Sequence, residues 1–252
     1  ARFGPGDPRW DTACSGLAAG AHRLSPGSLV RALEALASTA PASGSEAVTA
    51  GSPFSGAAEA VIGSLTPQLG TLGPTVVADA LRLMAAAGIA EQTYLDVLLA
   101  QLLVLLRRDR TAFTSPLLAS LAGALGALQE AGLSAKRASS GASSAANRRC
   151  TEALSELITE SLGDFGEEEV ARTGGVYLVA YSDDAQRRAA LHRAAELGVG
   201  FRNGGAFLAA MQGVERAVRQ HSFAFIASLP DETKDYLMRL KAASAPTPPP
   251  LS

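Results

Sequence analysis

The chain has 252 residues, 47% of them hydrophobic, which is enough to bury a sizeable core in one or two domains. Only 5% are aromatic, and alternating runs of Val, Ile, Thr and aromatic residues are almost absent, which argues against a β-rich fold. A net charge of −2 argues against a chain that simply coats nucleic acid. We therefore expect an all-α fold with a core of Leu, Ala and Val.

The cysteines and the hydropathy of the chain indicate which cellular compartment suits it. Cys14 and Cys150 lie outside any CxxC or His–Cys spacing, so they predict neither a disulfide framework nor a metal site. The most apolar run, 95–106, is shorter than the roughly 20 residues that cross a bilayer. We expect no membrane span and see no secretory signal. The arginine-bearing first ten residues look like those of a trimmed organellar protein, which suits the mitochondrial matrix.

Three compositional breaks divide the chain. Residues 37–57 and 134–147 are rich in Ser, Ala and Gly and lack apolar periodicity, which predicts flexible linkers. The prolines of residues 242–252 exclude a helix there. The predicted organisation is a first segment with one repeat helix (1–36), a helical-repeat lobe (58–133), a C-terminal helical lobe (148–241) and a Pro-rich tail (242–252).

Four helices are predicted before the second linker, from apolar residues at helical spacing. The helix over 91–108 is apolar on most faces, so we expect it to be sandwiched between others. The remaining three each have a proline at the start, and two of them end at a glycine. They span residues 25–38, 73–88 and 115–132, with stripes of Leu29, Leu33 and Leu36, of Val77, Leu81 and Met84, and of Leu121, Leu125 and Leu128.

Five more helices are predicted in the C-terminal lobe. In the second of them, the run GVYLVAY (175–181) could instead form the only strand of the protein. The five cover residues 151–163, 167–182, 183–198, 204–229 and 231–241.

The predicted helices are related to one another in sequence. An offset of 44 residues aligns Gly88 with Gly132 and Leu81 with Leu125, while an offset of 110 aligns Leu81 with Leu191. The N-terminal helix aligns with residues 72–85 in the same way, with Leu33 on Leu81. These matches predict degenerate helix-pair repeats of about forty residues, packed as an α-solenoid-like array in two lobes.

The repeat unit begins with Leu24-Ser25-Pro26, continues through Leu29, Leu33 and Leu36, and has its fullest form over 74–106. It resembles the heptatricopeptide-type repeats of RAP and FAST-kinase-like organellar RNA proteins, over about half of the chain. The resemblance implies an α-solenoid that works on RNA in mitochondria or plastids, often inside ribosomes. The chain lacks a C-terminal RAP-like domain and is slightly acidic, which favours a scaffold over an independent RNA-processing protein.

We accordingly expect a non-catalytic structural subunit of a large organellar assembly, first of all a lineage-specific mitochondrial ribosomal protein that touches protein neighbours and rRNA. The alternative is an accessory subunit of a respiratory or ATP synthase complex, without RNA. Basic residues are the expected phosphate contacts, although charge runs are also ordinary solvated surface. The candidate RNA-binding residues are Arg107, Arg108, Arg110, Lys136, Arg137, Arg148, Arg149, Arg187, Arg188, Arg193 and Arg202.

No catalytic constellation emerges, so we expect no enzyme, no cofactor, no metal and no small-molecule substrate. His22, His192 and His221 are far apart and fit no metal spacing. The carboxylates of 167–169 are consecutive, so they fan round a helix instead of converging. Cys150 adjoins two arginines that could lower its pKa, but no histidine accompanies it.

The glycine-rich run 198–205 is interpreted as a turn between helices. It follows a helix instead of a strand and matches neither phosphate-loop pattern. In the alternative interpretation, a helix N-terminus there binds a phosphate through Arg202 and Asn203.

Overall fold

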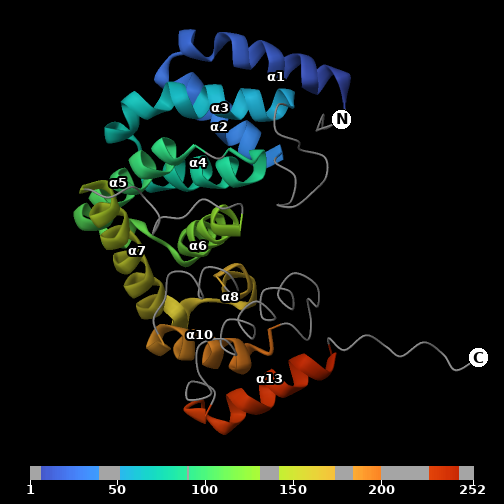
Figure 1. Ribbon diagram of the computed structural model, residues 1–252, viewed down its shortest axis with the longest axis vertical. Coiled ribbons are helices and arrows are strands. Elements are labelled where there is room, and N and C mark those ends of the chain that lie inside the picture. Colours follow the sequence, from blue (N-terminus) through green and yellow to red (C-terminus); the bar gives the residue numbers. More distant parts are fainter. Residues whose placement is uncertain are drawn as a thin grey trace, which may run out of the picture. The chain divides into compact units, whose positions relative to one another are not determined.

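The computed structural model describes residues 7–39, 52–89, 91–130, 142–173, 184–199 and 227–243, and every regular element among them is helical (Figure 1). The prediction of an all-α fold is confirmed for these residues. The run 175–181 and all but the end of the predicted helix 204–229 lie outside them. The chain divides into two compact units, Ala1–Leu154 and Ser155–Ser252.

The first unit holds seven α-helices among its described residues. Prolines occupy the first turn of the first four, where a missing N–H costs nothing and φ is already helical. The side chains of Asp7 and Ser52 cap the first and third. The helices are α1 (Pro8–Gly20), α2 (Pro26–Thr39), α3 (Pro53–Leu65), α4 (Pro74–Ala87), α5 (Gln92–Arg108), α6 (Ser115–Glu130) and α7 (Ala142–Ser161), of which α7 continues into the second unit.

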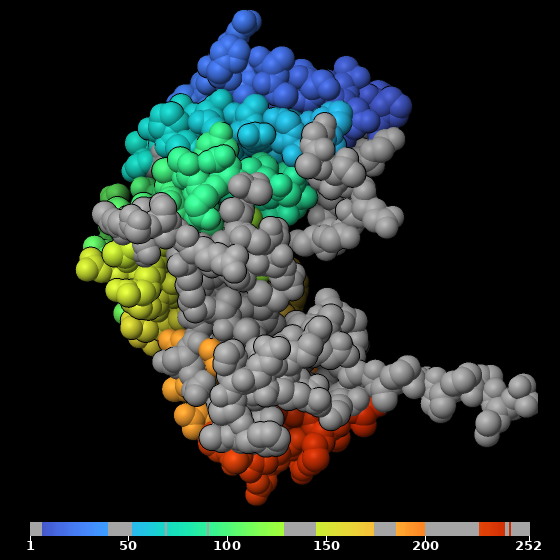
Figure 2. Space-filling view, viewed as in Figure 1, coloured from blue at the N-terminus to red at the C-terminus, as the bar shows by residue number. Residues whose placement is uncertain are grey.

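Alternate helices of this unit pack side by side. Helix α4 packs against both α2 and α6, and α3 packs against α1. The two sets also meet, because α3 contacts α2 and α4 (Figure 1). In the space-filling view, α1 and α3 form one continuous surface (Figure 2). Leu33, Leu81 and Leu125, which the sequence comparison aligned, are all buried on α2, α4 and α6.

Helix α4 ends at a glycine because the chain there adopts a left-handed conformation. Gly88 has φ 63° and ψ 31°, and the N–H groups of Gly88 and Ile89 donate to the carbonyls of Ala85 and Met84. The Ser55 hydroxyl, from the first turn of α3, donates to the Ala87 carbonyl at 3.0 Å in a buried position. The end of α4 is thereby tied to the start of α3.

Replacing Gly88 with alanine is expected to lower the free energy of unfolding by about 1 kcal/mol, because a side chain at positive φ is strained. A Cβ atom at Gly88 would meet nothing within 4 Å, so the effect is conformational and not steric. Gly16→Ala is the matched control: Gly16 lies within α1, also in open space, and alanine there should stabilise by about 0.5–1 kcal/mol. Urea unfolding of both variants tests the pair, and a loss at neither position would contradict the account.

Both predicted linkers are shorter than the sequence indicated. Helix α2 runs through Thr39 and α3 begins at Pro53, inside the expected linker 37–57. Helix α7 begins at Ala142, inside the expected linker 134–147. Its first turns are rich in alanine, a strong helix former, and Asn147 is tied by a hydrogen bond to α5. Helix α1 was not predicted, because Cys14 is its only buried residue and it lacks a clear apolar stripe.

The second unit contains η4 (Leu162–Asp164), α8 (Glu167–Thr173), α10 (Asp184–Leu197) and α13 (Asp231–Ala243). Helix α10 packs against each of the other three. Phe165, Leu191 and Tyr236 are buried in this unit. The Tyr236 hydroxyl donates to the carbonyl of Val199, just beyond the end of α10, and burial raises the pKa of this phenol. None of the described helices is both long and apolar enough to cross a membrane.

Candidate interaction surfaces

The last turn of α5 presents the first group of predicted RNA-binding residues. Arg107 and Arg108 close the helix and Arg110 lies in the short η3 (Arg110–Ala112); all three are exposed. Positive side chains at this end are favoured by the partial negative charge of the helix C-terminus. The basic side chains at the end of α5 are therefore exposed to solvent.

Asp109, between these arginines, is held by its own turn. Its carboxylate accepts hydrogen bonds from the N–H of Thr111 at 2.9 Å and from the Thr111 hydroxyl at 2.6 Å. These bonds hold the pKa of Asp109 below its ordinary value, with a smaller contribution from Arg108. The carboxylate starts η3 instead of forming a close ion pair with Arg107 or Arg108.

Helix α7 presents the second group. Arg148 and Arg149 are exposed, and Arg148 lies 3.6 Å from Glu152 in an exposed pair one helical turn apart. Such pairs contribute little to stability and are easily exchanged for another partner. The other two basic residues of this stretch, Lys136 and Arg137, lie outside the described residues.

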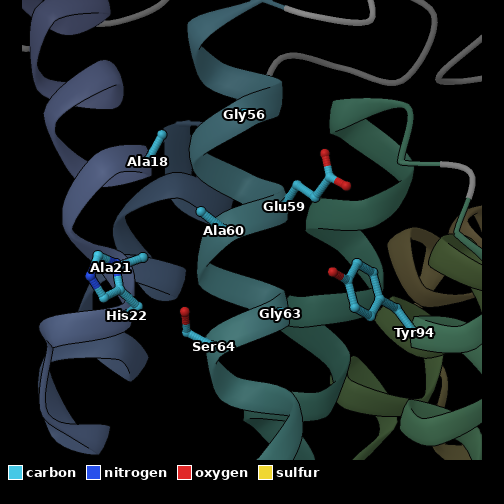
Figure 3. Close-up of a pocket in the computed structure, with 9 residues that line it drawn as sticks. All are labelled: Ala18, Ala21, His22, Gly56, Glu59, Ala60, Gly63, Ser64 and Tyr94. Carbon is cyan, nitrogen blue, oxygen red and sulfur yellow. The ribbon is translucent and has the colours of Figure 1, made fainter.

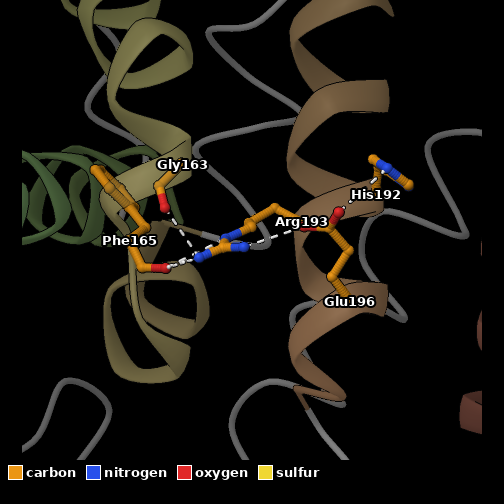
Figure 4. A network of polar contacts seen from close by, with 5 residues as sticks. All are labelled: Gly163, Phe165, His192, Arg193 and Glu196. Carbon is orange, nitrogen blue, oxygen red and sulfur yellow. Dashed lines mark hydrogen bonds and ion pairs between the residues drawn. The ribbon is translucent and has the colours of Figure 1, made fainter.

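Arg193 of α10 has an intramolecular role that the sequence did not suggest. Its guanidinium donates to the carbonyl oxygens of Gly163 at 3.0 Å and Phe165 at 3.1 Å, and pairs with Glu196 at 3.1 Å (Figure 4). These contacts hold the turn at the end of η4 against α10. A phosphate contact of Arg193 stays a prediction, and it would compete with these intramolecular bonds.

The other basic residues of α10 remain on the surface. Arg188 is exposed, and its guanidinium approaches the Ser228 hydroxyl at 3.4 Å, while Arg187 is half-buried. His192 lies 3.5 Å from Glu196 and is half-exposed, as expected for a solvated histidine. Arg202 and Asn203, with most of the glycine-rich run, lie outside the described residues.

The three consecutive carboxylates are used locally at the start of α8. Glu169 accepts the N–H of Gly166 at 3.1 Å, and Glu168 pairs with Arg172 one turn later. Both interactions suit the positive N-terminal end of a helix. Glu169 therefore caps the helix, and Glu168 forms an exposed ion pair within it.

A pocket of about 540 Å³ lies on the first unit along α3, between the end of α1 and Tyr94 of α5. Its floor is made of small residues of α3, and the Tyr94 hydroxyl points toward Gly63 (Figure 3). A Cβ atom at Gly63 would lie 2.9 Å from that hydroxyl, so glycine makes room for the tyrosine. The lining residues are Ala18, Ala21, His22, Gly56, Glu59, Ala60, Gly63, Ser64 and Tyr94.

Two of the polar residues that line this pocket are exposed. Glu59 and His22 are exposed, and His22 Nε2 accepts a hydrogen bond from the Arg23 side chain at 3.2 Å. The pocket is an open hollow between helices.

A buried polar contact joins α5 to α7. The Asp96 carboxylate accepts hydrogen bonds from the amides of Gln92 at 2.9 Å and Asn147 at 2.6 Å. Asn147 is fully buried, and its Oδ1 has no hydrogen-bond partner among the described residues. The contact sets the register of α7 on the first unit. Sequence analysis missed it because the two residues are 51 positions apart.

Neither cysteine is placed for catalysis. Cys14 and Cys150 are both buried and unpaired, and burial raises the pKa of Cys150 to about 12. The neighbouring arginines do not lower it, since both point to solvent while the thiol is buried. Among the described residues, no cluster of His, Cys, Asp and Glu could hold a metal ion.

Cys150 should therefore resist thiol reagents in the native protein. In a Cys14→Ala variant, which leaves a single thiol, we expect an aromatic disulfide reagent at pH 8 to label Cys150 only when urea unfolds the protein. The pKa of Cys150 is higher in the folded protein than in the unfolded chain, so the thiol ionises only in the unfolded chain between about pH 9 and 12. The free energy of unfolding should therefore fall as the pH rises through this range. Rapid labelling of the native variant would contradict the burial of this group.

No family model, curated protein or solved structure matches the chain.

Proposed function

We propose that the chain is a non-catalytic structural subunit of a large organellar assembly, with a lineage-specific mitochondrial ribosomal protein as the first candidate. In the mitochondrial matrix it would bind neighbouring proteins through exposed helix faces and rRNA through the basic ends of helices. The resemblance to heptatricopeptide-type repeats supports the same setting.

One observation carries the proposal: α4 packs between α2 and α6, and these are the helices that the sequence aligns with one another. Related helices stacked in sequence order are typical of helical-repeat proteins, in which each pair buries its apolar face against the next. We infer a short α-solenoid-like array in the first unit. Such arrays usually act by presenting extended binding surfaces, not by chemistry.

The distribution of charge supports a partner with negative groups. Arg107, Arg108 and Arg149 are exposed, whereas Arg193 is used inside the second unit. Phosphates of RNA and carboxylates of neighbouring proteins both suit exposed arginines. Contacts to phosphate would weaken steeply with added salt.

The test is sedimentation of the tagged native protein from gently lysed organelles, with and without RNase. The proposal predicts that the chain travels with rRNA in a large particle that breaks up under RNase. Co-sedimentation with inner-membrane enzyme subunits in an RNase-resistant particle would instead support the alternative, an accessory subunit of a respiratory or ATP synthase complex. Sedimentation as a free chain in both conditions would contradict both.

A further inference from the structure

One face of α5 is left uncovered. The sequence predicts that this helix is sandwiched between others, and six of its seven leucines are buried, all but Leu105. The opposite face, however, carries Val97, Ala100 and Val104 at helical spacing. Val97 is half-buried, Ala100 is exposed, and Val104 is 57% exposed, one of two large hydrophobic side chains that are exposed among the described residues. A small apolar stripe therefore runs along the outside of α5.

This stripe ends in positive charge. Arg107 and Arg108 follow Val104 by three and four residues, so they lie on the same face one turn further on. Neither forms an ion pair with another described side chain. The two carboxylates nearest along the chain are engaged elsewhere, Asp109 by Thr111 and Asp96 by Gln92 and Asn147. Asp109 acts on Arg108 only weakly, and no described carboxylate forms an ion pair with either arginine.

We propose that the outward face of α5 docks an acidic amphipathic helix of a neighbouring protein subunit. The partner's apolar stripe would lie on Val97, Ala100 and Val104, and its carboxylates would pair with Arg107 and Arg108. This inference rests on the proposed function, because it names the kind of partner that meets the chain inside the assembly.

The chemistry of the face favours a helix over RNA. The short side chains of Val97 and Ala100 allow a second helix to approach to the usual distance of about 8–10 Å, and an exposed valine at 104 gains from an apolar partner. RNA phosphates would satisfy the arginines but gain nothing from the valines. The aromatic side chain nearest to this stripe on α5 is Tyr94, whose hydroxyl lies against Gly63 of α3 and not over the stripe. Charge and apolar surface together therefore suit a protein.

The direction of the partner also follows. Carboxylates are favoured in the first turn of a helix, and neighbouring helix dipoles attract when antiparallel. Because the arginines lie at the C-terminal end of α5, the partner helix runs antiparallel to α5. Its carboxylates then precede its apolar stripe by about one turn.

The experiment places a photoreactive phenylalanine analogue at Gln101, which is half-buried at the edge of the same face. The tagged full chain is expressed in cells, and the native particle is isolated and irradiated. A matched control carries the analogue at Thr12, an exposed position on α1. We expect position 101 to form an RNase-resistant cross-link to one protein, at a segment with helical apolar spacing preceded by Asp or Glu. Position 12 should not form that product.

Charge reversal then tests the arginines. Arg107→Glu with Arg108→Glu should lower the cross-link yield at position 101 about tenfold, since each partly exposed ion pair accounts for a factor of about three. Arg107→Lys with Arg108→Lys should retain most of it. Arg31→Glu, at an exposed position on α2, is the control for a general effect of charge.

Several outcomes would overturn the inference. A cross-link to RNA, a cross-link to a second copy of the chain, or no specific product in a particle that retains the chain would each exclude an acidic helix, while leaving the proposed function intact. A yield that is unchanged by charge reversal would exclude the role of the arginines. Absence of the chain from every particle would overturn both the inference and the proposed function.

Discussion

Replacing Leu81 with alanine is expected to lower the free energy of unfolding of the first unit by about 2–5 kcal/mol. Leu81 is fully buried on α4, the helix that contacts both α2 and α6. Truncating this side chain removes apolar contacts and leaves a cavity. The cavity cannot fully collapse, because α4 is held by helices on two sides.

The measurement is urea unfolding followed by the fluorescence of Trp10, the only tryptophan in the chain. Trp10 lies in α1, which packs on α3, so it reports on the first unit. Val104→Ala is the matched control: it also removes aliphatic carbon, but from a side chain that is more than half exposed, and should cost well under 1 kcal/mol. Equal losses for the two variants would show that α4 does not occupy the centre of this packing.

Replacing Arg193 with alanine should destabilise the second unit by about 2–3 kcal/mol. The substitution leaves the carbonyls of Gly163 and Phe165 without their charged donor, and hydrogen bonds to charged groups contribute about 1.5–3 kcal/mol. The guanidinium is 26% exposed, so water can replace part of the loss. A phosphate-binding arginine on an open surface would show no such effect.

Hydrogen exchange on the full chain measures this change locally. Amides over 162–173 and 184–199 should lose protection in the Arg193→Ala variant, while those of α4 should not. Arg172→Ala is the matched control, because it removes an exposed pair with Glu168 in the same unit, and pairs of this kind contribute about 0–1 kcal/mol. Unchanged exchange in Arg193→Ala would show that these hydrogen bonds do not stabilise the unit. Arg193 would then be better explained as a contact to a partner.

The apolar stripes carried most of the fold that sequence analysis could predict. Regular spacing of leucines identified α2, α4 and α6, and the aligned residues Leu33, Leu81 and Leu125 are all buried. This succeeded because burial in a helix repeats every 3.6 residues, and leucine marks it clearly. Helix α1 escaped because small residues can pack one helix against another without forming a stripe.

The candidate sites were less predictable, because side-chain partners depend on contacts between distant residues. Eleven basic residues were candidates by charge alone, yet Arg193 is tied to carbonyls about 30 positions away. The bond between Asp96 and Asn147 likewise ties α5 to the last residue of a segment that was predicted to be a flexible linker. The uncovered face of α5 was hidden for the opposite reason: its composition indicated burial on most sides, and only packing reveals which side lacks a neighbour.

The most direct measurement of the central claim is the copy number of the chain in the RNase-sensitive particle. Quantitative mass spectrometry with isotope-labelled reference peptides would compare the chain with rRNA-bound subunits of the same purified particle. A structural subunit predicts one fixed ratio, close to one chain per particle, which persists through washes at moderate salt. A ratio well below one that falls with each wash would contradict the account and indicate a transient factor.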